Sequence, residues 1–201
     1  MKTLNQLQLA KELIRFPSIT PVDAGIMKFL EKKLKRLGFK TKTLEFKERG
    51  FKPVKNLYAR FGNKSPNFCY AGHLDVVPPG NVKDWTTNPF RPSIKRGHLI
   101  GRGANDMKSS VAAFVSAVST FLSLNKKFSG SISLFMSGVE EGDAAFIQGQ
   151  AGFQFWPYFY LGAKHMVTGF DHLAFLAGVI FFLYKLKDVG LYVTLFAIGH
   201  S

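Results

Sequence analysis

Apolar residues recur at the spacing of an α-helix in two segments near the amino terminus. The stripe of the first segment consists of Leu4, Leu7, Ala10 and Ile14. The stripe of the second segment consists of Ala24, Met27, Leu30, Leu34 and Leu37. Pro17 follows the first segment and Gly38 follows the second, and both residue types commonly stand where a helix has ended. The pattern therefore predicts two amphipathic helices, each with one face in a core.

The second helix also has signals for its first residue. Thr20 has a side chain that can cap a helix, Pro21 suits the first helical position, and Asp23 stands three residues after the cap. We therefore predict that this helix begins at Pro21.

From residue 40 onward the hydrophobic period changes to two. Alternation predicts strands over residues 41–46, 54–61 and 131–137, and a short apolar run predicts a buried strand over residues 67–71. Residues 78–92 are rich in Pro, Gly and Asn and predict a loop, whereas residues 107–124 predict a long, weakly polar helix. Helices that alternate with strands indicate an α/β layer architecture with a mixed or parallel sheet and flanking helices.

Composition and charge narrow the class of protein. The chain has 201 residues and a net charge of +14, of which residues 1–143 carry +13 because the five charged side chains after Asp143 contribute only +1. The lysines are dispersed rather than gathered in a run with aromatic residues, which argues against a nucleic-acid partner. The single cysteine, Cys69, lies in an apolar run and is expected to be buried. No secretory signal is visible at the amino terminus, and a cytoplasmic location is expected.

Five titratable residues follow strand-like runs or open the long helix. They are His73, Asp75, Asp106, Glu140 and Glu141. In α/β folds, ligands gather beyond the carboxyl ends of the strands, so three chain segments bring these side chains to one edge of a sheet. An isolated histidine after a strand is usually structural, and paired glutamates in a loop are usually solvated. Their joint occurrence favours a site.

Imidazole and carboxylate groups are ligands of hydrolytic metal sites, in which the metal activates water and keeps an open coordination position. Asp75 is placed to accept the imidazole N–H of His73 and so to set its tautomer. Two adjacent glutamates can divide the work, one binding metal and the other moving a proton. The five residues therefore predict a metal-dependent hydrolytic site.

The same stretches resemble the amino-terminal half of the succinyl-diaminopimelate desuccinylase family, within the wider group that includes acetylornithine deacetylase and carboxypeptidase G. The matching stretches are Pro17–Pro21, Gly72–Gly80, Trp85 with Pro89-Phe90, Gly101–Lys108 and Glu140–Asp143. The resemblance covers residues 1–143 and implies a dinuclear zinc or cobalt hydrolase that cleaves an N-acyl amide bond of a small amino-acid substrate in diaminopimelate and lysine biosynthesis. Val139 departs from the family, which usually has a third acidic residue there.

The resemblance also implies a role for each of the five residues. His73 binds one metal, Asp106 bridges two metals and Glu141 binds the other. Glu140 is the general acid/base, and Asp75 is the supporting carboxylate. The family's remaining ligands, its dimerisation domain and its substrate-binding arginines are not found in this chain.

The chain changes character after Asp143. Residues 166–184 are almost entirely apolar and long enough to cross a bilayer core of about 30 Å. Four residues of types that can bind metal stand in or beside the apolar runs, namely His165, Asp171, His172 and His200. Residues 165–176 and 194–201 resemble the start of the HupE/UreJ family of membrane proteins. That resemblance implies a second metal site, for nickel, formed by these four residues. The alternative is a hydrophobic hairpin with incidental histidines.

The sequence thus predicts a partial metallohydrolase domain over residues 1–143, a junction over 144–151, and a hydrophobic helical hairpin over 152–201 that associates with membranes if it inserts. The amino-terminal region (residues 1–143) is expected to bind metal weakly and to turn over little substrate, because its set of ligands is incomplete. The rival hypothesis is a membrane-anchored protein for metal binding or transport, in which the amino-terminal region is a remnant. A genuine fusion, a frameshifted product and a misfolded product all remain open.

Overall fold

The computed structural model describes residues 3–47, 49, 52–125 and 127–139. The chain divides into two units, Met1–Gly149 and Gln150–Ser201, and all the described residues belong to the first. The predicted hairpin over residues 152–201 therefore lies outside the described residues.

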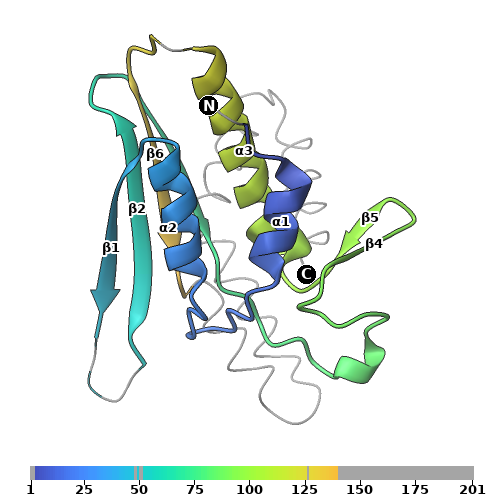
Figure 1. Ribbon diagram of the computed structural model, residues 1–201. Coiled ribbons are helices and arrows are strands. Elements are labelled where there is room, and N and C mark those ends of the chain that lie inside the picture. Colours follow the sequence, from blue (N-terminus) through green and yellow to red (C-terminus); the bar gives the residue numbers. More distant parts are fainter. Residues whose placement is uncertain (1–2, 48, 50–51, 126, 140–201) are drawn as a thin grey trace, which may run out of the picture. The chain divides into compact units, whose positions relative to one another are not determined.

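The described part is a mixed α/β fold (Figure 1), which confirms the predicted class for this part of the chain. Its helices are α1 (Gln6–Ile14), α2 (Ile26–Arg36) and α3 (Ser109–Leu124). Its strands are β1 (Lys40–Phe46), β2 (Val54–Gly62), β3 (Asn67–His73), β4 (Ser93–Lys95), β5 (His98–Ile100) and β6 (Ser131–Ser137). Two short helical turns complete the fold, at Val82–Asp84 and Ala104–Lys108.

The main sheet has the strand order β1-β2-β6-β3. β1 and β6 both run antiparallel to β2, and β3 runs parallel to β6. The sheet is therefore mixed, and β1 and β3 are the two edges of the part that the structure describes. The prediction of a buried strand over residues 67–71 is wrong, because Phe68 and Cys69 are exposed. Because β3 and β6 are parallel neighbours, their carboxyl ends, His73 and Ser137, lie side by side.

The core lies between one face of this sheet and the three helices. Leu57 and Ala59 of β2 face Met136 and Leu134 of β6, and these side chains join those of α1, α2 and α3 in one buried cluster. α1 and α3 pack against each other, whereas α2 covers β1 and β2. Burial of these aliphatic side chains is the main force that holds the helices on the sheet.

The start of α2 differs from the sequence prediction. The helix begins at Ile26, five residues later than expected, and Thr20 pairs with Val76 through its backbone rather than capping α2. Asp23 is the residue that caps it. Its carboxylate accepts hydrogen bonds from the backbone N–H groups of Gly25 and Met27, at 3.0 and 3.1 Å. The chain needs the left-handed φ of +87° at Gly25 to bring both donors to one side chain.

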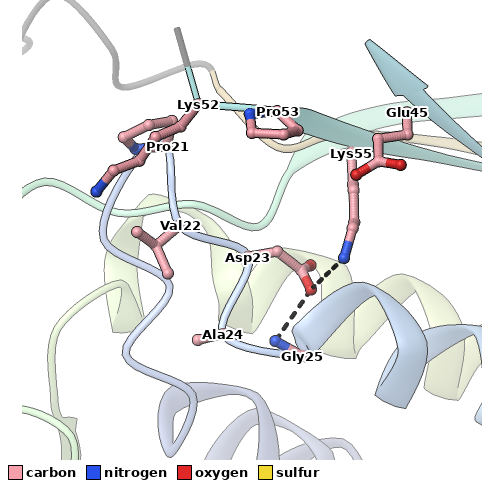
Figure 2. Close-up of a pocket in the computed structure, with 9 residues that line it drawn as sticks. All are labelled: Pro21, Val22, Asp23, Ala24, Gly25, Glu45, Lys52, Pro53 and Lys55. Carbon is pink, nitrogen blue, oxygen red and sulfur yellow. Dashed lines mark hydrogen bonds and ion pairs between the residues drawn. The ribbon is translucent and has the colours of Figure 1, made fainter. Parts of the chain in front are cut away.

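The cap of α2 forms one wall of a surface hollow, which Figure 2 shows. Asp23 and Lys55 face each other across it at 4.0 Å, with Glu45 nearby on β1. The hollow is lined by none of the candidate site residues, so we assign Asp23 a structural role.

Replacing Asp23 with alanine is expected to lower the free energy of unfolding by about 1–2 kcal/mol, because two backbone donors lose their acceptor. Chemical denaturation of the full chain measures this. Asp23→Asn retains an acceptor oxygen and should lose clearly less. Glu45→Ala is the matched control in the same hollow, and its loss of an exposed ion pair should cost less than about 1 kcal/mol. Equal losses for Asp23→Ala and Glu45→Ala would contradict the capping role.

One helical stretch among the described residues, Ala104–Leu124, is long and apolar enough to cross a membrane by length and composition. Asp106 and Met107 inside it have non-helical backbone angles, so the regular helix is α3 alone, with 16 residues. At about 1.5 Å per residue its length is roughly 24 Å, short of a bilayer core of about 30 Å. One face of α3 belongs to the buried cluster, and we interpret it as a core helix.

Candidate active site

The first part of the candidate site is the chain that leaves β3. His73 ends this strand and Asp75 follows two residues later; both side chains are buried. A segment near the amino terminus holds this stretch in place, because the Ser18 hydroxyl donates to the carbonyl of Leu74 at 2.7 Å and the N–H of Val76 donates to the carbonyl of Ser18 at 2.9 Å. Two stretches that the sequence singled out, 17–21 and 72–80, are thus paired in the fold.

The second part is the turn that leads into α3 and carries Asp106. Gly103 precedes this turn with a left-handed φ of +78°, and a Cβ there would lie 2.6 Å from Cγ1 of Val76. Glycine at this position lets the turn lie directly against the chain that follows His73. Gly72 acts similarly, since a Cβ there would lie 3.0 Å from Cε of Met107.

The fold brings three of the predicted site residues together. Nε2 of His73 lies 3.1 Å from Oδ1 of Asp106. Nδ1 of the same ring lies 3.1 Å from the backbone carbonyl of Asp75 and 3.5 Å from its Oδ1. The imidazole therefore lies between two aspartates, with one nitrogen facing each. The Asp75 side chain is buried, whereas that of Asp106 is 68% exposed and opens to solvent.

Burial by itself lowers the pKa of His73, but hydrogen bonds to the carboxylates of Asp106 and Asp75 outweigh it and raise the pKa to about 10. The ring therefore holds a proton between the two carboxylates. A metal ion that binds Nε2 would replace that proton, so binding would release a proton.

A metal fits between His73 and Asp106. Two ligand atoms that bind one zinc at about 2.0–2.1 Å in tetrahedral geometry lie roughly 3.3 Å apart, close to the observed 3.1 Å between Nε2 and Oδ1. An imidazole and a carboxylate are suitable zinc donors, and the contact from Nδ1 to Asp75 fixes the tautomer in which Nε2 can bind metal. Within the described ranges, no group of three or more His, Cys, Asp or Glu side chains is arranged to hold a metal.

The other predicted site residues lie outside the described residues. These are Glu140, Glu141, His165, Asp171, His172 and His200. Their predicted roles stay predictions. The position of Glu140 and Glu141 in the sequence is relevant nevertheless, since β6 ends at Ser137 beside His73, and the two glutamates follow it by three and four residues.

Lys108, the last residue of the Gly101–Lys108 stretch, has no role predicted from the sequence. This lysine is fully buried, and its ammonium group donates to the carbonyl of Phe16 at 2.8 Å. Burial lowers its pKa to about 7, and the nearby charge of Asp75 opposes that shift. The sequence offered one signal for this residue, because Lys108 stands two residues after the candidate ligand Asp106 and at the start of an apolar helix.

Asp106 also lines a hollow, together with Val76, Val77 and residues 101–105. Arg102 forms part of this wall. Its guanidinium donates to the carbonyl of Pro78 at 3.1 Å and stacks 5.2 Å from the ring of Trp85, whose indole N–H donates to the carbonyl of Pro79 at 2.8 Å. The Gly72–Gly80, Trp85 and Gly101–Lys108 stretches thus form one packed unit around the hollow.

Known proteins match the amino-terminal region in sequence. The chain is 67% identical over 144 residues to the succinyl-diaminopimelate desuccinylase of Pelagibacter ubique, and 53% identical over 138 residues to that of Rhodospirillum centenum. These matches cover 72% and 69% of the chain. The amino-terminal region resembles succinyl-diaminopimelate desuccinylase. The chain spans only 38% and 36% of the length of these two relatives.

Solved structures show the same fold. Human carnosine dipeptidase 1 matches with a TM-score of 0.61 and 29% identity, over 68% of this chain and 32% of the dipeptidase. An M20 family metallo-carboxypeptidase from Sulfolobus solfataricus matches with a TM-score of 0.59 and 24% identity, over 70% of this chain and 32% of that one. The described part is therefore a mixed α/β fold like that of the M20 catalytic domain.

A different family matches the rest of the chain. Residues 141–201 match the family model described as HupE / UreJ protein. The resemblances predicted for both parts of the sequence are thus confirmed. This second match begins at the desuccinylase-like Glu140–Asp143 stretch.

Proposed function

We propose that the amino-terminal region is the metal-binding part of a hydrolase that cleaves the N-succinyl amide bond of an amino-acid substrate. The observation that carries the proposal is the 3.1 Å approach of Nε2 of His73 to Oδ1 of Asp106 at the end of β3. It occurs in a fold like that of the M20 catalytic domain, in a chain 67% identical to a desuccinylase.

In this proposal His73, Asp106 and Glu141 would hold zinc or cobalt. The metal, when bound, supplies a Lewis acid that lowers the pKa of water and polarises the amide carbonyl. Asp75 keeps the His73 ring oriented. Glu140 takes a proton from the attacking water and passes it to the leaving amine.

We further propose that this polypeptide by itself binds metal weakly and turns over little substrate. The part that matches desuccinylases corresponds to little more than a third of their length, and residues 141–201 match a different family. A site with few protein ligands binds metal weakly, because water molecules occupy the remaining coordination positions and do not tie the metal to the protein.

The test is to purify the full chain, measure bound zinc and cobalt, and assay hydrolysis of N-succinyl-diaminopimelate with metal added. We expect weak metal binding and turnover near the background rate. Full turnover with two tightly bound metals would contradict the proposed weakness of the site. If the unmodified chain binds zinc no more strongly than a His73→Ala variant does, His73 is not a metal ligand.

Asp75→Asn is expected to weaken zinc binding about 10–100-fold, because the amide no longer stabilises the positive charge that the bound His73 ring acquires. Isothermal titration of the full chain with zinc measures the change. Asp84→Asn, in the exposed turn Val82–Asp84, is the control and should leave zinc affinity unchanged. Equal affinities for the two variants would show that Asp75 does not support the metal.

The family match at residues 141–201 favours a second candidate, a membrane-associated protein of the HupE/UreJ type. In this candidate a metal ion is bound by His165, Asp171, His172 and His200. The resemblance to the HupE/UreJ family implies that the metal is nickel. The amino-terminal region stays in the cytoplasm. Cell fractionation tests this candidate. Recovery in the membrane pellet after carbonate extraction would support it, whereas a soluble, monodisperse protein would contradict it.

A further inference from the structure

Lys108 is a buried cation that the proposed chemistry does not use. It stands immediately before α3, and its side chain is among the largest that the described part of the fold buries completely. A lysine is rarely buried without partners, because removing its charge from water is costly. The contacts of this ammonium group therefore show what it holds in place.

The ammonium group reaches the segment that follows α1, the helix that packs beside α3 (Figure 1). It donates to the carbonyl oxygen of Phe16 at 2.8 Å, and the same oxygen accepts from the backbone N–H of Ser18 at 2.8 Å. The backbone N–H of Lys108 also closes its own turn, since it donates to the carbonyl of Gly103 at 2.9 Å. The turn that carries Asp106 is therefore anchored at its end to the segment after α1.

The same segment holds the chain that carries His73. The buried side chain of Ser18 donates its hydroxyl hydrogen to the carbonyl of Leu74 at 2.7 Å. Leu74 stands between His73 and Asp75 in the sequence. Lys108 and Ser18 thus attach two parts of the chain, each with one candidate ligand, to a single stretch of backbone. Hydrogen bonds made by buried groups in this way fix a geometry.

We propose that Lys108 is a positioning residue for the candidate site. Its ammonium group anchors the Asp106 turn to the segment that also anchors the chain around His73, and the two anchors together hold the carboxylate beside the imidazole. This inference rests on the proposed function, because it concerns the same pair of ligands. In this role Lys108 acts through the position of Asp106, as groups that orient metal ligands do.

The charge of Lys108 gives the test its direction. The ammonium group attracts the carboxylate of Asp75, which lies against the ring of His73. A cation in this place repels a metal ion at the site, so its removal should, by charge alone, strengthen zinc binding. Weaker zinc binding after its removal would therefore report a loss of position rather than a loss of charge.

The experiment replaces Lys108 with methionine in the full chain and measures zinc affinity by isothermal titration. Methionine is unbranched and apolar, so it fills the space and removes the ammonium group. We expect zinc affinity to fall at least about tenfold, the lower end of the loss typical for a group that orients a ligand.

Ser119→Ala is the matched control. The buried hydroxyl oxygen of Ser119 accepts from the backbone N–H of Leu4 at 2.9 Å, so it also ties the amino-terminal segment to α3, but away from the candidate site. This variant should lose stability to chemical denaturation and keep its zinc affinity.

A second readout needs no metal. The Nε2–H proton of His73 faces Asp106, and a hydrogen-bonded proton is protected from exchange with water. Proton NMR of the metal-free chain detects it, and its absence from His73→Ala assigns the signal. We expect Lys108→Met to lose or shift this signal and Ser119→Ala to retain it.

Ser18→Ala removes the other anchor and repeats the test if Lys108→Met does not fold. It should weaken zinc binding by a similar factor, because the chain around His73 is then released. In the double variant the loss should be smaller than the product of the two single losses, since breaking either anchor already separates the ligands.

Tighter zinc binding by Lys108→Met would overturn the proposal, and so would equal zinc affinities for Lys108→Met and Ser119→Ala. If the unmodified chain binds zinc no more strongly than His73→Ala does, the proposed function fails, and the Nε2–H signal alone then decides whether Lys108 positions the pair. Zinc binding at His73 that Lys108→Met leaves unchanged would contradict the role of Lys108 and leave the proposed function standing.

Discussion

Replacing His73 with alanine is expected to weaken zinc binding by the full chain about a hundredfold or more. Loss of a group that only orients a ligand costs roughly 10–100-fold, and His73 is the ligand itself in the proposed site. A hundredfold change corresponds to about 2.7 kcal/mol of binding free energy. Isothermal titration with zinc measures the loss, and Asp106→Ala should produce one of similar size because Oδ1 of Asp106 faces the same space.

The control for this experiment is His98→Ala. His98 begins β5 and is exposed, away from the 3.1 Å pair of His73 and Asp106. The His98→Ala variant should leave the affinity of the tightest zinc site unchanged. If both histidine variants lose affinity equally, zinc binds the chain nonspecifically and the candidate site is wrong. If neither loses affinity, the metal binds elsewhere in the chain.

Replacing Gly103 with alanine is expected to lower the free energy of unfolding by about 2–5 kcal/mol. An L-residue at a φ of +78° costs about 1–2 kcal/mol, and the new Cβ would lie 2.6 Å from Cγ1 of Val76, an overlap that typically costs about 1–3 kcal/mol. Chemical denaturation measures the loss. Zinc affinity should fall as well, because relief of the overlap moves the turn that carries Asp106 away from His73.

Gly97→Ala separates the two causes. Gly97 has a φ of +81°, but nothing lies within 4 Å of the position of its Cβ. This variant should therefore lose only the backbone contribution, about 1–2 kcal/mol, and keep its zinc affinity. Equal destabilisation by the two variants would show that the approach of Gly103 to Val76 contributes nothing to the fold.

The periodic segments of the sequence gave reliable predictions. Met27, Leu30, Leu34 and Leu37 are buried as the stripe of α2 requires, and Gly38 follows the helix with a φ of +90°. Ala24 was wrongly included in that stripe, because it precedes α2 and is exposed. In α1 the prediction was partly wrong. Leu7 is 42% exposed, whereas Leu9 and Leu13 are buried, because α1 packs on α3 with a face rotated from the predicted stripe.

Local signals were less reliable than periodicity. Thr20 and Pro21 satisfy the rules for a helix start, yet the backbone pairing of residues 18–20 with Val76 holds them outside the helix. The hairpin of β4 and β5 went unpredicted, since each strand has only three residues and no period can be read from so few. Its turn at Arg96 and Gly97, both with positive φ, was the available signal.

The sequence by itself determined which side chains are candidate metal ligands, that they follow strand-like runs or open the long helix, and that residues 1–143 and the rest resemble different families. Residue type and spacing suffice for that. Only the tertiary structure decided that His73 and Asp106, 33 residues apart, meet at 3.1 Å, that Lys108 is buried, and that β3 is an edge of the described part of the sheet. Strand order and side-chain approach depend on contacts between distant segments, and local periodicity carries no information about them.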